Sequence, residues 1–417
     1  MTPDKTKDKT ILVIGTYDTK QAELSFLAET IRGQGGGVMS MDVSVLGDPE
    51  TPTDISKHQV AGAGGSSIRA AIDSGDENHA MQIMATGAAA EALRLVRAGA
   101  AHGVLILGGT MGTDLALDVC AALPLGVPKY IVSTVSFSAM LPPERIAADV
   151  QMILWAGGLY GLNAICKSSL AQAAGAVLGA ARAARPPVRD RPLIGMTSFG
   201  KTILHYMTRL KPALESRGYE VAVFHATGMG GRAFESLAAQ GAFACVMDFA
   251  IQEVVNHHMG SGISAGADRL TSAGRRGTPQ MVAPACYDLV DLIGWQPIPA
   301  RLQGRPSHAH NRILTSVTLT TQERREIAGV LGDRLAQATG PSVFFLPLAG
   351  GNEWDRPGGP LHDAEGLAAF NAAMQAAIPD GCGLQLLDCH INDAPFCDAV
   401  LAQFDAWVAQ GIVPRPA

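Results

Sequence analysis

The chain alternates short apolar runs with longer segments whose apolar residues recur at the helical period. Apolar runs rich in β-branched residues at 11–15, 38–43, 103–107 and 129–134 predict buried strands, and the segment 78–98 predicts a long amphipathic helix. Strands that alternate with helices in this way are typical of a parallel sheet with helices on both faces. The first half of the chain therefore predicts a doubly wound α/β domain.

The second half repeats the pattern, with strands predicted at 193–197, 219–224, 244–247, 280–283, 342–346 and 383–387. A segment with three prolines and four charged residues, 185–192, separates the halves and cannot form a buried element. We expect two Rossmann-like domains, residues 1–185 and 190–417, with mostly parallel sheets and a ligand cleft between them. The segments 288–306 and 349–360 are expected to be long irregular loops, which are commonly functional.

Four turns rich in Gly and Thr follow predicted strands and precede predicted helices, at residues 15–20, 108–113, 195–202 and 227–231. Backbone N–H groups converge where such a helix begins, so each turn is a candidate anion site. The second predicted strand carries Asp42 downstream of the first glycine turn, where a dinucleotide fold often places an acid on a ribose hydroxyl. The alternative is that Asp42 caps the loop that follows it.

Residues 195–202 match G-x-x-x-x-G-K-T, the phosphate-binding loop in which the lysine reaches the terminal phosphates. The alternative is that residues 193–197 form the strand itself, with Gly195 inside it, and that an ordinary turn follows. The pattern alone leaves both interpretations open.

Histidine supplies the other candidate chemistry. His308 and His310 form a His-x-His pair that can place two imidazoles on one side of an extended chain, as a metal site requires. His390 and Asp393 follow the last predicted strand and have the composition of a general acid/base pair, although a helix-capping role for Asn392 or Asp393 explains the positions equally well. With His225, these side chains are expected at the same sheet edge, as a catalytic cluster.

Composition narrows the class of protein. The net charge of −6 and the 5% aromatic content give no electrostatic or stacking surface for nucleic acid. Seven cysteines without a Cys-x-x-Cys pattern indicate reduced thiols. The polar N-terminus and the lack of an 18-residue apolar run predict neither signal peptide nor membrane span, so we expect a cytoplasmic protein.

Several motifs together resemble the Tm-1-like ATP-binding domain family. They are IGTYDTK from residue 14, MDVS from 41, LGGTMGT from 107, FHATGMGGRA from 224, HAHN from 308 and HINDA from 390. The resemblance spans essentially the whole chain in the same order. It implies two Rossmann-like domains, ATP binding and a tendency to form homodimers. The family pattern has no lysine at the position of Lys201, which disfavours the phosphate-loop interpretation.

The expected function is therefore an ATP-dependent or other nucleotide-dependent enzyme, with Mg²⁺, that acts on a small polar metabolite. Catalysis is assigned to His225, His308, His310, His390 and Asp393. Nucleotide binding is assigned to Gly15, Thr16, Asp18, Thr19, Lys20, Asp42, Gly108, Gly109, Thr110, Gly112, Thr113, Gly228, Gly230 and Gly231. The alternatives are a nucleotide-responsive binding module without catalysis, and a metal-dependent hydrolase or lyase with a transition metal on His308 and His310.

Overall fold

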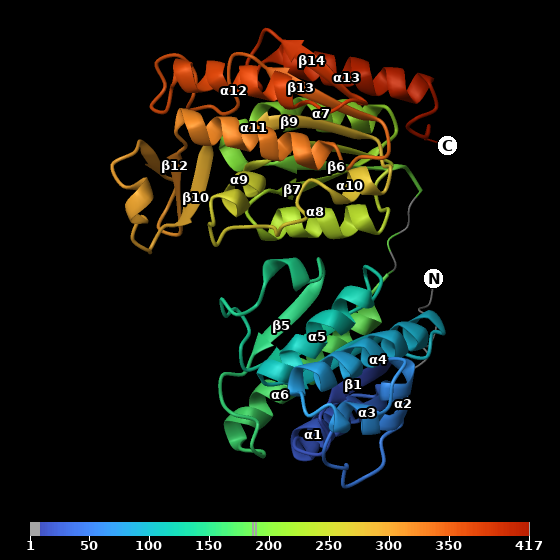
Figure 1. Cartoon of the computed structure of the whole chain (residues 1–417). Helices are drawn as coiled ribbons and strands as arrows, with labels where there is room; N and C mark the ends of the chain where they lie inside the picture. Colours follow the sequence, from blue (N-terminus) through green and yellow to red (C-terminus); the bar gives the residue numbers. More distant parts are fainter. Residues whose placement is uncertain (1–8, 186, 188–189, 417) are drawn as a thin grey trace. The chain divides into compact units, whose positions relative to one another are not determined.

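The structure is a computed structural model that describes residues 9–185, 187 and 190–416, with the backbone alone at residues 201 and 202. The chain forms two compact units, residues 1–188 and 189–417. Each unit has its own parallel sheet covered by helices (Figure 1). The predicted α/β class with two Rossmann-like domains is confirmed.

Unit 1 contains a five-stranded parallel sheet in the order β2-β1-β3-β4-β5. Its strands are β1 (Thr10–Gly15), β2 (Gly37–Asp42), β3 (Gly103–Gly108), β4 (Lys129–Ser133) and β5 (Val150–Leu154). Its helices are α1 (Gln21–Gly33), α2 (Lys57–Ala63), α3 (Ile68–Asp73), α4 (Glu77–Arg97), α5 (Thr110–Ala122), the 3-10 turn η1 (Pro143–Arg145) and α6 (Ala164–Ala183).

Two apolar cores enclose the sheet of unit 1. Alternate residues of a strand point to opposite faces, so Leu12 packs with α2–α5 on one face while Val13 packs with α1 and α6 on the other. The helix α6 is long and apolar enough to cross a membrane by length and composition. One side of it, including Leu170 and Val177, is buried against the sheet and α1, as in a core helix.

Unit 2 contains a six-stranded parallel sheet in the order β14-β13-β9-β8-β6-β7 and a three-stranded antiparallel sheet in the order β10-β12-β11. The parallel strands are β6 (Leu193–Ser198), β7 (Glu220–His225), β8 (Cys245–Ala250), β9 (Gln280–Ala285), β13 (Ser342–Pro347) and β14 (Cys382–Leu387). The antiparallel strands are β10 (Leu289–Ile293), β11 (Ser307–Ala309) and β12 (Leu314–Thr318). The helices are η2 (Gly200–Ile203), α7 (Leu204–Ser216), α8 (Met229–Ala239), α9 (Gln252–His258), α10 (Ser272–Arg275), η3 (Ala300–Leu302), α11 (Thr321–Leu335), α12 (Ala364–Ala377) and α13 (Ala394–Ala409).

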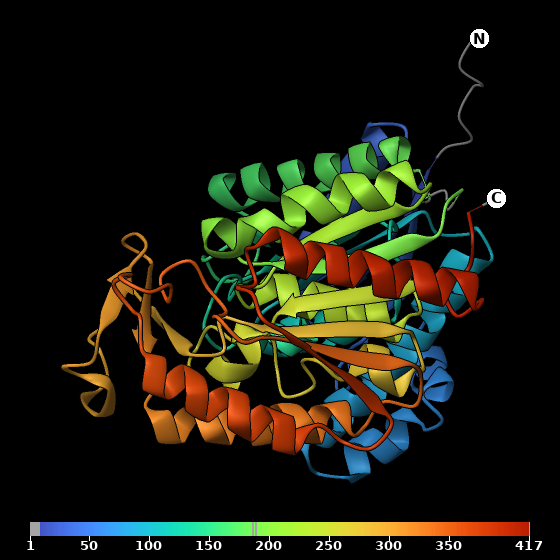
Figure 2. The same ribbon diagram turned by 90° about the horizontal axis from the view of Figure 1, so that it is seen from above.

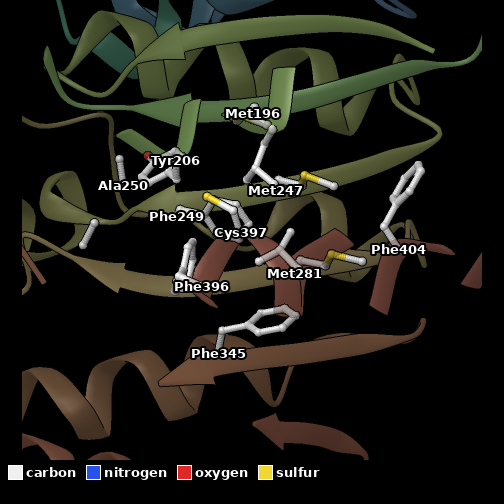
Figure 3. Close-up of a cluster of buried hydrophobic side chains, with 14 of the residues drawn as sticks. Met196, Tyr206, Met247, Phe249, Ala250, Met281, Phe345, Phe396, Cys397 and Phe404 are labelled. Carbon is white, nitrogen blue, oxygen red and sulfur yellow. The ribbon is translucent and has the colours of Figure 1, made fainter. Parts of the chain in front are cut away.

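Helices α7 and α13 cover one face of the large sheet, and α9, α11 and α12 cover the other. The first core is rich in aromatic and sulfur-containing side chains, among them Met247, Phe249 and Phe396 (Figure 3). The rings of Phe249 and Phe396 meet nearly edge to face, with centroids 5.3 Å apart. The antiparallel sheet lies at one side of the large sheet (Figures 1 and 2).

One expectation from the sequence needs correction here, and one pair of open alternatives is decided. The segment expected to be irregular at 288–306 contains β10, which pairs with β12 from Leu289↔Thr318 to Ile293↔Leu314 and so belongs to a small sheet. Gly195 lies inside β6 and pairs with Ala222 and Val246, while a Cβ at this position would contact Phe234 and Phe243 at 3.0 and 2.9 Å. Gly195 therefore serves close packing within a strand and does not begin a phosphate-binding loop.

Candidate functional site

The strand order of unit 1 creates one position where ligands bind in open α/β sheets. From β1 the chain moves to β2 on one side, and the strands that follow lie on the other side of β1, beginning with β3. The connections at the carboxyl ends of β1 and β3 therefore diverge and leave a crevice between them. The turns at 15–20 and 108–113 lie at these two strand ends.

A cavity of about 650 Å³ occupies this edge of unit 1. Its polar side is formed by Thr16, Asp18, Thr19, Lys20 and the start of α5, Gly108 to Gly112. Its other side is largely apolar and is formed by Val43, Val45, Leu46, Ala71, Ile72, Ala80 and Met81, with Gly75, Asp76 and Glu77 nearby. The volume is in the range of small-molecule and cofactor sites.

The beginning of α5 provides the backbone donors of the cavity. Gly109 is the N-cap residue, and no side chain caps the helix. The first N–H groups of a helix have no acceptor within it and carry partial positive charge. Gly108 has a steric role, because a Cβ there would lie 2.5 Å from the Cα of Gly112. The 13-residue helix therefore presents uncapped N–H groups to a cavity, as anion sites require. Thr113 lies behind this turn, fully buried, and its hydroxyl bonds to Gly109 O and Ser133.

The turn after β1 contributes side chains to the cavity, because the backbone N–H groups of residues 17–20 already donate to other groups of the protein. Tyr17 N donates to Asp42 Oδ1 at 3.2 Å, and Asp18 N donates to Ser44 Oγ at 3.1 Å. The N–H groups of residues 19 and 20 both donate to the carbonyl of Thr16. What this turn offers a ligand is the hydroxyls of residues 16 and 19, the carboxylate of Asp18 and the ammonium of Lys20.

Asp18 and Asp42 have structural contacts that the sequence did not predict. Asp18, assigned to nucleotide binding, does line the cavity, and its Oδ2 accepts from Gly47 N at 3.2 Å. Asp42 is 1% exposed and is not among the residues that line the cavity. Its Oδ1 accepts from Tyr17 N, Ser44 N and Ser44 Oγ. Asp42 thus holds the turn after β1 in place, and the structure does not present it to a ribose.

The glycine turn at 227–231 in unit 2 already binds an anionic group of the chain itself, the carboxylate of Glu253. Glu253 Oε1 accepts from the N–H groups of Gly228 and Gly231, at 2.5 and 3.0 Å. A Cβ at Gly231 would lie 1.7 Å from Glu253 Oε2, and a Cβ at Gly230 would lie 1.8 Å from the carbonyl of His225. These glycines, expected to bind nucleotide, allow the close approach of a buried carboxylate and of β7.

A buried ion cluster extends from Glu253 to the switch point between β6 and β8. Arg269 is fully buried and bonds to Glu253, Asp248 and Glu235, while Asp248 also accepts from Thr197 Oγ1 at 2.8 Å. Burial raises the pKa of the Glu235 and Glu253 carboxyls, and the Arg269 charge opposes that shift. The Arg269 side chain therefore fills in unit 2 the position that is a cavity in unit 1.

Three of the four expected catalytic histidines lie near one another. The rings of His308 and His310 are 5.1 Å apart between centroids, and both pack on Trp354, at 4.2 and 4.7 Å. Phe199 links this group to His225, with centroid distances of 6.0 Å to His310 and 5.7 Å to His225. Partial desolvation lowers the pKa of the exposed His225 ring, burial lowers the pKa of His310, and the neighbouring His308 and His225 lower that of His310 further.

His390 and Asp393, expected to form an acid/base pair, are held by contacts within the chain. His390 is 1% exposed; its Nε2 lies 2.9 Å from both Asn352 O and Asp355 Oδ1, and its Nδ1 accepts from Asn392 N at 3.1 Å. Asp393 accepts from His390 N and from Arg356. Both imidazole nitrogens of His390 are thus engaged by the chain, so His390 anchors the loop after β13.

The expected metal pair lacks further protein ligands. Within residues 9–185, 187 and 190–416, no group of three or more His, Cys, Asp or Glu side chains is arranged to hold a metal ion. His308 and His310 instead face Trp354 and Phe199. The geometry at this position favours packing of the two imidazoles against aromatic rings over a metal centre.

Comparison with known protein families places both units in one family. Residues 9–186 match the N-terminal domain, and residues 191–408 the C-terminal domain, of an uncharacterised protein family, UPF0261. The chain belongs to the UPF0261 family. A UPF0261 protein of Brucella melitensis is 52% identical over 98% of this chain and 98% of its own length. A UPF0261 protein of Clostridium tetani is 34% identical over 94% of this chain and 97% of its own length.

The chain is also similar to part of a plant protein. The ToMV resistance protein Tm-1(GCR237) of Solanum lycopersicum is 29% identical over 72% of this chain, in a match that covers 41% of the tomato protein. This similarity supports the resemblance drawn from the motifs. The match covers less than half of the plant protein.

Several residues that shape the candidate sites of this chain could not be recognised from a local sequence pattern. Glu253 and Arg269 lie in segments without a recognisable motif, and only the fold brings them to the glycine turn. Ile72 and Met81, on the apolar side of the cavity, are ordinary helix residues in the sequence. Trp354 lies in the segment 349–360, which was expected only to be irregular, and its contacts with the histidines depend on the anchoring of that loop.

Proposed function

We propose that this UPF0261 protein binds an adenine nucleotide, such as ATP, in the cavity of unit 1. The observation that carries the proposal is the uncapped N-terminus of α5 opening into a 650 Å³ cavity with one polar and one apolar side. Phosphate oxygens would accept from the N–H groups of residues 109–112, and Lys20 would supply a counter-charge. The apolar side, with Ile72 and Met81, would contact the base.

The chemistry of the cavity supports this ligand over a purely apolar one. The hydroxyls of Thr16 and Thr19 lie 3.0 Å apart, and Lys20 Nζ lies 3.3 Å from Thr19 Oγ1, so three polar groups are grouped on one turn. Asp18, Asp76 and Glu77 also line the cavity and would serve Mg²⁺ or sugar hydroxyls. The similarity to the Tm-1-like family, from which ATP binding was expected, agrees with this assignment.

Calorimetric titration of the full chain with Mg·ATP tests the proposal. Lys20→Ala is expected to weaken binding by about tenfold, since it removes one charge-assisted contact. Lys201→Ala is the matched control, because residue 201 follows β6 in unit 2, where Gly195 lies inside a strand. Equal binding by both variants and the unchanged chain, or no binding by any of them, would contradict the assignment.

Gly109→Ala provides a second, backbone-directed test. A Cβ at Gly109 would meet only Thr134 Oγ1, at 3.8 Å, and its φ of −74° suits alanine, so the variant should fold normally. The methyl group would stand where phosphate must approach the helix start. Loss of ATP binding with an unchanged melting temperature is the expected result.

A further inference from the structure

The five rings of His225, His308, His310, Phe199 and Trp354 form a cluster in unit 2, which we term the ring cluster. They come from four separate segments: β7, the residue after β6, the region of β11, and the loop after β13. The centroid distances between neighbouring rings run from 4.2 to 6.0 Å. Three of these segments follow parallel strands at their carboxyl ends, the edge where α/β sheets bind ligands.

One nitrogen of the ring cluster lacks a partner. His310 Nε2 is buried and makes no hydrogen bond within the described part of the chain. A buried polar atom without a partner costs about 1–3 kcal/mol, and an orphan atom beside other functional side chains indicates a missing ligand or water. His225, by contrast, is exposed, and its Nδ1 lies 3.3 Å from Thr227 Oγ1. The cluster therefore combines an unsatisfied interior nitrogen with a solvent-exposed imidazole.

The carboxylates near the ring cluster are already engaged. Glu353, beside Trp354, accepts from Asn392 Nδ2 at 2.9 Å and from Arg356 Nε at 3.3 Å. Asp355, on the other side of Trp354, accepts from His390 and from Gly351 N. The imidazoles thus have no described carboxylate as a hydrogen-bond partner, so no carboxylate of the described residues competes with a ligand for the N–H donor of each ring.

We propose that the ring cluster binds a small oxyanion, with a carboxylate as the primary candidate, whose oxygens accept from His310 and His225. The flat rings of Trp354 and Phe199 would contact the remainder of the ligand. This site is separate from the nucleotide cavity of unit 1 and does not depend on that proposal. Neutral imidazoles, which the lowered pKa of His225 and His310 favours at pH 7, each retain one N–H donor.

Histidine-selective ¹⁵N labelling of the full chain tests this proposal with pyruvate and inorganic phosphate as probes. Pyruvate is expected to shift the ring nitrogen signals of His310 and His225, and to leave those of the exposed His58 on α2 unchanged. A response to phosphate alone would assign the site to phosphate compounds, within the same oxyanion chemistry. No response to either probe, or an equal response at His58, would overturn the proposal.

Paired substitutions separate binding from packing. His310→Phe keeps an aromatic ring against Trp354 but removes the donor, so probe affinity should fall by about tenfold. His310→Gln restores an N–H group and should recover part of that affinity, whereas a merely structural imidazole would show no such rescue. Mg·ATP binding by the same variants reports on unit 1 independently and should be unchanged.

Discussion

Glu253 Oε1 lies 3.0 Å from the N–H nitrogen of Gly231, so a buried carboxylate of the chain occupies the helix start of α8. The same side chain bonds to Arg269 through its other oxygen, at 2.8 Å. The turn that precedes α8 also follows His225, the end of β7. The Glu253 carboxylate therefore fixes both the glycine turn and the backbone next to a member of the ring cluster.

Removing the charge of Glu253 should strongly destabilise unit 2. Glu253→Gln keeps the shape but leaves two N–H groups and Arg269 with a weaker acceptor, so the free energy of unfolding should fall by about 3–5 kcal/mol. Denaturant unfolding of the full chain measures this loss. A change below about 1 kcal/mol would show that the ion cluster contributes little.

Gly231→Ala should also be destabilising, because its Cβ would lie 1.7 Å from Glu253 Oε2. Gly329→Ala in α11 is the matched control, since its Cβ would meet nothing within 4 Å. In an exposed helix position alanine is favoured over glycine by about 1 kcal/mol, so the control should be slightly stabilised. In thermal melting, the melting temperature should therefore fall for Gly231→Ala and rise slightly for Gly329→Ala.

His390→Ala should behave as a structural change, in contrast to a catalytic substitution. It removes the donor to Asp355 and Asn352 and the acceptor for Asn392 N, at an expected cost of about 1–3 kcal/mol. Release of the loop after β13 should also alter the fluorescence of Trp354. An unchanged melting temperature and unchanged fluorescence would argue against the anchoring role.

The raised pKa of Asp288 predicts that the stability of the folded protein depends on pH. Burial, with a smaller contribution from Asp355, raises the pKa of Asp288 from its ordinary value of 3.8 to about 7. The folded state then holds a proton that the unfolded state releases, so this group lowers stability as pH rises from about 4 to about 7. Asp288→Asn should flatten that decline in urea-unfolding curves measured across the interval. An identical slope in the variant would exclude Asp288 as its source.

The amino-acid pattern by itself determined the α/β class, the two units and the six parallel strands of unit 2, because buried strands and amphipathic helices have local periodicities. It also marked the turns at 15–20 and 108–113, since glycine-rich turns that follow predicted parallel strands lie at the carboxyl edge of the sheet, where ligands bind. The small antiparallel sheet was not predicted, because β10 lies in a segment rich in turn residues and pairs with a strand more than 20 residues later.

Tertiary structure alone decided which glycine turn is available to a ligand. The turns at 108–113 and 227–231 look alike in sequence, yet only the second receives a carboxylate from another helix, and Glu253 carries no local signal of that contact. The histidines differ for the same reason: His390 is fixed by Asp355 and Asn352, whereas Nε2 of His310 has no hydrogen-bond partner among the described residues. Hydrogen-bond satisfaction depends on partners distant in the chain, so periodicity and motif spacing do not reveal it.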